Sequence, residues 1–204
     1  AFEMMVELGS MPVMQILSQA TRVIAEGEVL QLSKVRDAST TEDTYMEVIR
    51  GKTAMLFEAS THSAAALAGS PEVQSEALRH FGDHLGIAFQ LVDDLLDYQG
   101  DAATLGKNVG DDLAEGKPTL PLIYTMREGT PEQAALVRKA IQKGGIEDLE
   151  SIRAAVEASG SLDYTAQLAR DYVARAIKCL EALPASEYRD ALVELSEFAV
   201  ARTH

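Results

Sequence analysis

The sequence predicts an all-α fold, and three observations support this prediction. Apolar residues recur with the period of a helix along nearly all of the 204 residues, and no convincing two-residue alternation of a strand is present. Proline, serine or threonine stands where helices would begin, and glycine where they would end. Several segments between these breaks are long enough to cross a whole domain. We expect one all-helical domain over residues 1–204.

The first half of the chain contains four expected helices. The opening residues read as the middle of a helix, because they are apolar and lack an N-cap. Pro12 lies in the first turn of the second helix, and Ser39 with Glu42 forms a capping-box pattern before the third. Gly69 suits a left-handed helix cap, and Pro71 follows it. The expected ranges are about 1–8, 11–34, 42–67 and 71–98.

The second half begins with an interruption. Residues 100–117 contain four glycines among Asp, Lys and Asn, and no apolar stripe, so we expect a long loop. Helix resumes at residues 118–121. Thr130 and Gln133 form a second capping-box pattern with proline between them. The remaining glycine and proline breaks predict helices near 131–142, 147–158, 162–182 and 186–201.

Composition excludes several classes of protein. The 32 acidic residues exceed the 18 basic ones, which gives a net charge of −14 at pH 7. Nucleic acids and anionic membrane surfaces both require a basic footprint, so neither is an expected partner. No apolar run approaches the roughly 18–20 residues of a transmembrane segment. The single cysteine, Cys179, excludes an internal disulfide and fits a reducing, cytoplasmic location.

Acidic residues cluster near the end of the helix expected at 71–98. At about 100° per residue, Gln90, Asp93 and Asp97 fall within roughly 60° of one another, with Asp94 at the edge of this stripe. Carboxylates held this closely need a cation or a proton. Mg²⁺, which prefers oxygen ligands and retains waters and substrate phosphates, fits best. The alternative interpretation is a solvated acidic patch.

Lysines supply a complementary charge. Lys107 and Lys117 each follow a glycine in the expected loop, where an ammonium could reach a phosphate. Lys52 and Thr53 lie in an apolar stretch, where a lysine is usually a surface residue that extends toward water. The carboxylates at residues 111–115 lie in the loop, and we expect them to be mostly solvated.

These motifs resemble those of a known family. Residues 90–97, 106–112 and 115–121 are similar to the second aspartate-rich motif and following loop of the trans-type polyprenyl diphosphate synthases. Residues 51–54 resemble the Lys-Thr motif of this family, and residues 25–31 its preceding helix. The resemblance extends over nearly the whole chain and is strongest to bacterial long-chain enzymes of the octaprenyl type.

The resemblance implies an isoprenoid-synthase-type helical bundle around a central cavity and a homodimer. It also implies a Mg²⁺-dependent prenyltransferase that condenses an allylic, farnesyl-type diphosphate with successive isopentenyl diphosphates, and a role in ubiquinone side-chain supply. In the family pattern, Asp93, Asp94 and Asp97 would hold Mg²⁺. The leaving diphosphate would be neutralised by Lys52, Lys107 and Lys117, with Thr53 and Gln90 nearby. Glu28 and Gln31 would line the cavity.

One departure from the family pattern limits the expected activity. The family uses two aspartate-rich motifs, and none precedes Asp93 here, so we expect the first one upstream of Ala1 and the chain to be the C-terminal two-thirds of an enzyme. We therefore expect these residues alone not to turn over substrate. A shorter-chain synthase and a non-catalytic partner subunit remain alternative interpretations, and a purely structural helical module is a third.

Overall fold

The computed structural model describes residues 2–99, 110–144 and 147–201, and within these ranges it contains helices and no strand. The all-α prediction is therefore confirmed. No helix in the described part is both long and apolar enough to cross a bilayer. The elements are α1 Phe2–Leu8, α2 Met11–Lys34, α3 Glu42–Ile49, η1 Arg50–Ala54, α4 Met55–Leu67, α5 Glu72–Gln99, α7 Asp111–Glu115, α8 Leu120–Glu128, α9 Pro131–Lys143, α10 Leu149–Ala158, α11 Ser161–Cys179, η2 Leu180–Ala182 and α12 Glu187–Ala201.

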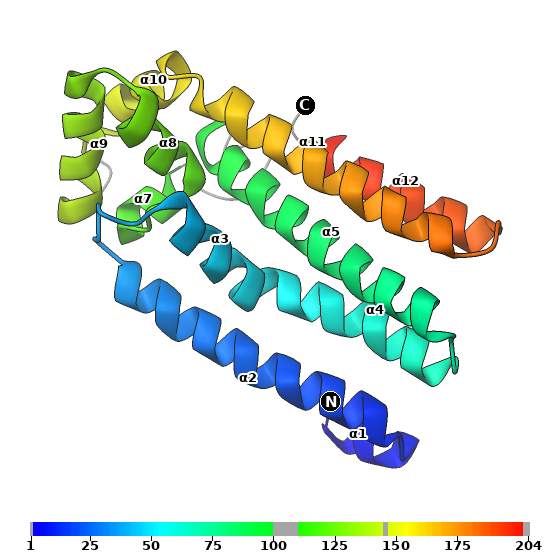
Figure 1. Ribbon diagram of the computed structural model, residues 1–204. Coiled ribbons are helices and arrows are strands. Elements are labelled where there is room, and N and C mark those ends of the chain that lie inside the picture. Colours follow the sequence, from blue (N-terminus) through cyan, green and yellow to red (C-terminus); the bar gives the residue numbers. More distant parts are fainter. Residues whose placement is uncertain (1, 100–109, 145–146, 202–204) are drawn as a thin grey trace.

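The long helices run side by side, and the short helices gather at one end of them. Figure 1 shows α2, the α3–η1–α4 segment, α5 and α11 as neighbouring rods, with α12 beside α11. Helices α7 to α10 lie together near the C-terminal end of α5. The expected aspartate cluster is at this end of α5, so the short helices place the α7–α8 connection near it.

Helix α5 is the central element of the core. It packs against α4 on one side and α11 on the other. Its residues Ile87 and Leu91 have no exposed surface and belong to a cluster with Tyr45 of α3 and Leu120 of α8. Burial of each large apolar side chain contributes about 1.5–3 kcal/mol. This packing fixes the side of α5 on which the polar residues 90, 93 and 94 emerge.

Most predicted helix boundaries are confirmed. Helix α2 covers the expected residues, α4 ends at the expected position, and Gly69 has a φ of 62° in the left-handed region. The capping box at Thr130 and Gln133 is present, with both of its hydrogen bonds formed. These signals are local, which explains their success.

Two local predictions were wrong. The N-cap of α3 is Thr41, whose hydroxyl accepts a hydrogen bond from Thr44 N, and not Ser39. Ser39 is unavailable because its hydroxyl donates to Asp37 Oδ1 at 2.5 Å. The expected loop at 100–117 contains helix α7, which the next subsection describes.

Candidate active site

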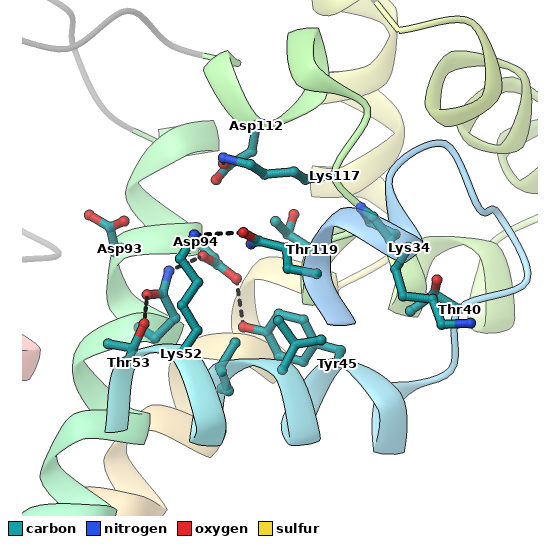
Figure 2. A pocket seen from close by; sticks show the side chains of 15 residues that line it. Lys34, Thr40, Tyr45, Lys52, Thr53, Asp93, Asp94, Asp112, Lys117 and Thr119 are labelled. Carbon is teal, nitrogen blue, oxygen red and sulfur yellow. Dashed lines mark hydrogen bonds and ion pairs between the residues drawn. The ribbon is translucent and has the colours of Figure 1, made fainter. Parts of the chain in front are cut away.

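A pocket of about 270 Å³ lies between α2, the α3–η1 segment, α5 and the α7–α8 connection (Figure 2). Seven of the ten predicted site residues line it, Glu28 and Asp97 do not, and Lys107 lies outside the described residues. The lining residues are Gln31, Lys34, Thr40, Tyr45, Val48, Ile49, Lys52, Thr53, Gln90, Asp93, Asp94, Asp112, Lys117, Pro118 and Thr119. The structure therefore brings together polar residues that are up to 88 positions apart in the sequence, from Gln31 to Thr119.

Lys52 and Thr53 lie in η1, a π-helical turn inserted between α3 and α4. A π turn changes the direction of the side chains within it, and such turns are frequent at functional sites. Two glycines hold η1 tightly between its neighbours. A Cβ on Gly27 of α2 would lie 2.6 Å from the backbone nitrogen of Lys52. A Cβ on Gly86 of α5 would lie 2.5 Å from Ala54 Cα.

The predicted residues Glu28, Gln31 and Lys52 are in contact. Lys52 Nζ donates to Gln31 Oε1 at 2.5 Å and forms an ion pair with Glu28 Oε2 at 3.1 Å. Gln31 lines the pocket, whereas Glu28 contacts it only through Lys52. The lysine ammonium is therefore held at the pocket by α2.

A chain of hydrogen bonds, part-buried at Thr53 and fully buried at Tyr45, links four residues of the pocket lining. Thr53 Oγ1 donates to Gln90 Oε1 at 2.8 Å, and Gln90 Nε2 donates to Asp94 Oδ1 at 2.7 Å. Tyr45 completes the chain, because its hydroxyl donates to Asp94 Oδ2 at 2.5 Å (Figure 2). Burial and the negative charge of Asp94 raise the pKa of the Tyr45 phenol, so the phenol remains a donor.

Asp94 is the most buried carboxylate of the pocket, with 2% of its surface exposed. Burial, followed by the charge of Asp112, raises its pKa to about 8, although the hydrogen bonds from Tyr45 and Gln90 act in the opposite direction. Asp93 adds a further repulsion. Burial and the neighbouring carboxylates therefore favour the protonated form of Asp94 in the ligand-free site.

Asp97 has a different environment from Asp93 and Asp94. Its carboxylate accepts hydrogen bonds from the backbone nitrogens of Gly110, Asp111 and Asp112 at 3.2, 3.2 and 3.3 Å. Burial and the charge of Asp112 raise the pKa of Asp97 to about 6, and these backbone donors partly offset the shift. The structure thus places Asp97 outside the pocket lining, where it holds the start of α7.

Helix α7 brings Asp112 and Lys117 to the pocket. We expected residues 111–115 to be mostly solvated because no helix would fix them, and for Asp112 this was wrong. Lys117 Nζ lies 3.1 Å from Asp112 Oδ1 and 2.9 Å from Glu115 Oε2. Although burial acts in the opposite direction, these two carboxylates raise the pKa of Lys117 and keep it charged.

The carboxylates of the pocket fit a divalent cation by their charge. Asp93, Asp94 and Asp112 line one cavity, and the raised pKa of Asp94 reflects burial first and then repulsion from Asp112 and Asp93, which a cation would relieve. Within the described residues, no group of three or more His, Cys, Asp or Glu side chains is arranged to hold a metal ion by itself. Mg²⁺ in proteins commonly takes one or two carboxylates and completes its shell with waters and substrate phosphates.

Sequence reasoning missed several pocket residues. Tyr45 is buried and lies in no motif, and Thr119 lies in a motif but was not predicted as a site residue. Lys34 ends α2 and Thr40 lies in the connection between α2 and α3, and neither was predicted. The predicted residue Lys107 lies outside the described residues.

Comparisons with known proteins agree with this geometry. The family model described as polyprenyl synthetase matches residues 1–159. The octaprenyl diphosphate synthase of Escherichia coli (strain K12) is 51% identical over 203 residues, which are 99% of this chain and 63% of that protein. The all-trans-nonaprenyl-diphosphate synthase (geranyl-diphosphate specific) of Rhodobacter capsulatus is also 51% identical, over 99% of this chain and 62% of that protein.

A solved structure is similar along the whole chain. The polyprenyl synthase from Caulobacter crescentus CB15, complexed with calcium and isoprenyl diphosphate, is 46% identical with a TM-score of 0.94. The match covers 100% of this chain and 62% of that one. The chain therefore spans a little over three-fifths of the length of the relatives that it matches.

Proposed function

The chain belongs to the polyprenyl synthetase family, and from this premise we propose that it forms one all-helical part of a Mg²⁺-dependent trans-polyprenyl diphosphate synthase. The proposed reaction joins an allylic, farnesyl-type diphosphate to successive isopentenyl diphosphates and yields a long-chain, octaprenyl-type diphosphate. The names of the relatives from Escherichia coli and Rhodobacter capsulatus support a long-chain product.

The observation that carries this proposal is the arrangement of opposite charges around one pocket. Acidic groups come from α5 and α7, and ammonium groups come from the end of α2, from η1 and from the α7–α8 connection. A solvated acidic patch does not explain why Asp94 is buried among them. A diphosphate with a bound metal ion matches both kinds of charge. The metal ion would meet the carboxylates, and the diphosphate oxygens would meet the lysine ammonium groups.

The residues of this chain have separable tasks in the proposed reaction. Bound Mg²⁺ would supply charge stabilisation for the departing diphosphate. Asp93 and Asp112 would hold the metal. Of the other two predicted ligands, Asp94 accepts hydrogen bonds from Tyr45 and Gln90, and Asp97 accepts them from the backbone at the start of α7. Lys52 and Lys117 would donate to the diphosphate oxygens as negative charge develops on them. The apolar side chains of Val48 and Ile49 line the same pocket and would keep water from the allylic cation.

Three further parts of the proposal concern the whole protein. We propose that it acts as a homodimer and that its product supplies ubiquinone side chains. We also propose a cytoplasmic location, which the single cysteine supports, because reducing compartments keep thiols free.

The binding part is tested by calorimetry with inorganic pyrophosphate in the presence and absence of Mg²⁺. We expect Mg²⁺-dependent binding that Asp93→Ala abolishes and Lys117→Ala weakens about tenfold, equivalent to about 1.4 kcal/mol. Asp171→Ala, at an exposed carboxylate of α11, is the matched control and should bind as the unmodified chain does. Unchanged binding by Asp93→Ala would remove the metal role of that residue.

The catalytic part is tested by a prenyl-transfer assay with Mg²⁺, farnesyl diphosphate and isopentenyl diphosphate. We expect these 204 residues to bind pyrophosphate but to release little polyprenyl product on their own. Abundant product would contradict that expectation. Stimulation of a complete synthase by an Asp93→Ala chain would instead favour a non-catalytic partner subunit.

A further inference from the structure

Tyr45 is a buried residue that the proposed reaction does not use directly. It lies on α3, has 5% of its surface exposed, and its hydroxyl is 2.5 Å from Asp94 Oδ2. A phenol and a carboxylate that are both buried each need a hydrogen-bonding partner, because burial of a polar group without one is costly. In this structure they provide that partner for each other (Figure 2).

The second oxygen of Asp94 determines how the amide of Gln90 is turned. Gln90 Nε2 donates to Asp94 Oδ1 at 2.7 Å, so the NH₂ end of the amide faces the carboxylate. The carbonyl end then faces Thr53, whose hydroxyl donates to Gln90 Oε1 at 2.8 Å. Because Tyr45 and Gln90 occupy different oxygens of Asp94, the carboxylate is held against rotation.

We propose that Tyr45 is a positioning residue that acts through Asp94 to keep the carbonyl oxygen of Gln90, rather than its NH₂ group, facing the pocket. This inference rests on the proposed function. A carbonyl oxygen carries partial negative charge and an amide NH₂ partial positive charge, so the two orientations have opposite effects on a cation in the pocket. The proposed reaction passes through such a cation.

The N-terminus of α3 is anchored one turn before Tyr45. Arg127 Nη1 donates to Glu42 Oε2 at 2.7 Å, and the Tyr164 hydroxyl donates to Glu42 Oε1 at 2.7 Å. The Arg127 guanidinium also lies 5.2 Å from the ring centroid of Tyr124. Helices α8 and α11 therefore hold α3 in place, and the Tyr45 hydroxyl is presented from a fixed element.

The test measures charge preference in the pocket with Tyr45→Phe, which keeps the ring and removes the hydroxyl. Calorimetry with saturating Mg²⁺ and inorganic pyrophosphate compares two probes of similar shape, dimethylallylammonium and the neutral dimethylallyl alcohol. We expect the unmodified chain to bind the ammonium at least tenfold more tightly than the alcohol. Tyr45→Phe should lose at least fivefold of this preference, while its affinity for pyrophosphate changes less than twofold.

Tyr172→Phe is the matched control, because Tyr172 is a buried tyrosine of α11 outside the pocket lining, and it should retain the preference. An unchanged preference in Tyr45→Phe, with pyrophosphate bound normally, would overturn the positioning role alone. Absence of pyrophosphate binding by the unmodified chain would overturn the proposed function as well. If Tyr45→Phe loses its helical circular dichroism, Tyr45→Met replaces it, because methionine also lacks the hydroxyl and fills much of the same buried space. Retention of the preference in that variant would refute the inference.

Discussion

Replacement of Asp94 by asparagine should stabilise the metal-free protein at neutral pH. The carboxylate is buried with 2% of its surface exposed, and its pKa is raised from 3.8 to about 8. An asparagine has nearly the same shape and can keep both hydrogen-bonding partners, with its NH₂ facing the Tyr45 oxygen and its carbonyl facing Gln90 Nε2. The substitution therefore removes a buried ionisable group without opening a cavity.

The magnitude follows from proton linkage. The pKa of this carboxyl is higher in the folded chain than in the unfolded chain, so the free energy of unfolding is greatest at low pH, where both states are protonated. Stability is then lost as the pH rises from 3.8 toward 8. Between pH 5 and pH 7 the unfolded chain has released the proton and the folded chain still holds it. Two pH units at about 1.4 kcal/mol each give an upper limit of about 3 kcal/mol for the loss in the unmodified protein.

Urea unfolding at pH 5, 6 and 7 in metal-free buffer, followed by circular dichroism, measures this effect. We expect the advantage of Asp94→Asn over the unmodified chain to grow by up to about 3 kcal/mol across this range. Glu157→Gln, at an exposed carboxylate of α10, should show no such growth. A difference that stays constant, or that shrinks as pH rises, would refute the reasoning.

Three further substitutions test the elements that support the site. Gly27→Ala should destabilise the protein by about 1–3 kcal/mol in urea unfolding, because the added Cβ would lie 2.6 Å from the backbone nitrogen of Lys52. Stability equal to that of the unmodified chain would show that α2 can move away from η1. Arg127→Ala should lower stability by about 1–2 kcal/mol, because it removes the ion pair with Glu42 and the cation–π contacts. Arg127→Lys should recover only part of this stability, and full recovery would contradict a role for the planar guanidinium. Asp97→Ala removes the acceptor for three amides at the start of α7, so hydrogen exchange there should accelerate, with a loss of about 1–2 kcal/mol; unaltered exchange would show that α7 holds itself.

The long helices could be predicted because their signals are local. Pro12, Gly69 and Thr130 act on residues within one turn of themselves, so a pattern in the sequence suffices to place a helix end. The aspartates at positions 93 and 94 could be placed on one helix for the same reason, because helical spacing alone relates them.

Helix α7 and the role of Tyr45 could not be predicted in this way. The five residues of α7 are held by the side chain of Asp97, which is 13 to 15 positions away from the amides that it binds. Tyr45 contacts Asp94 across 49 positions, and its apolar ring suits a core residue equally well. Such pairings arise from tertiary packing, which no periodicity in the sequence encodes.

The ion pairs of Lys52 and Lys117 have a consequence for ligand selectivity. Lys52 is paired with Glu28, and Lys117 with Asp112 and Glu115, before any ligand is bound. A small monovalent anion would have to displace these carboxylates while meeting the repulsion of the remaining acidic groups. A diphosphate that arrives with its own metal would satisfy both sets at once. We therefore expect the pocket to bind it in preference to simple anions such as chloride, even where chloride is in large excess.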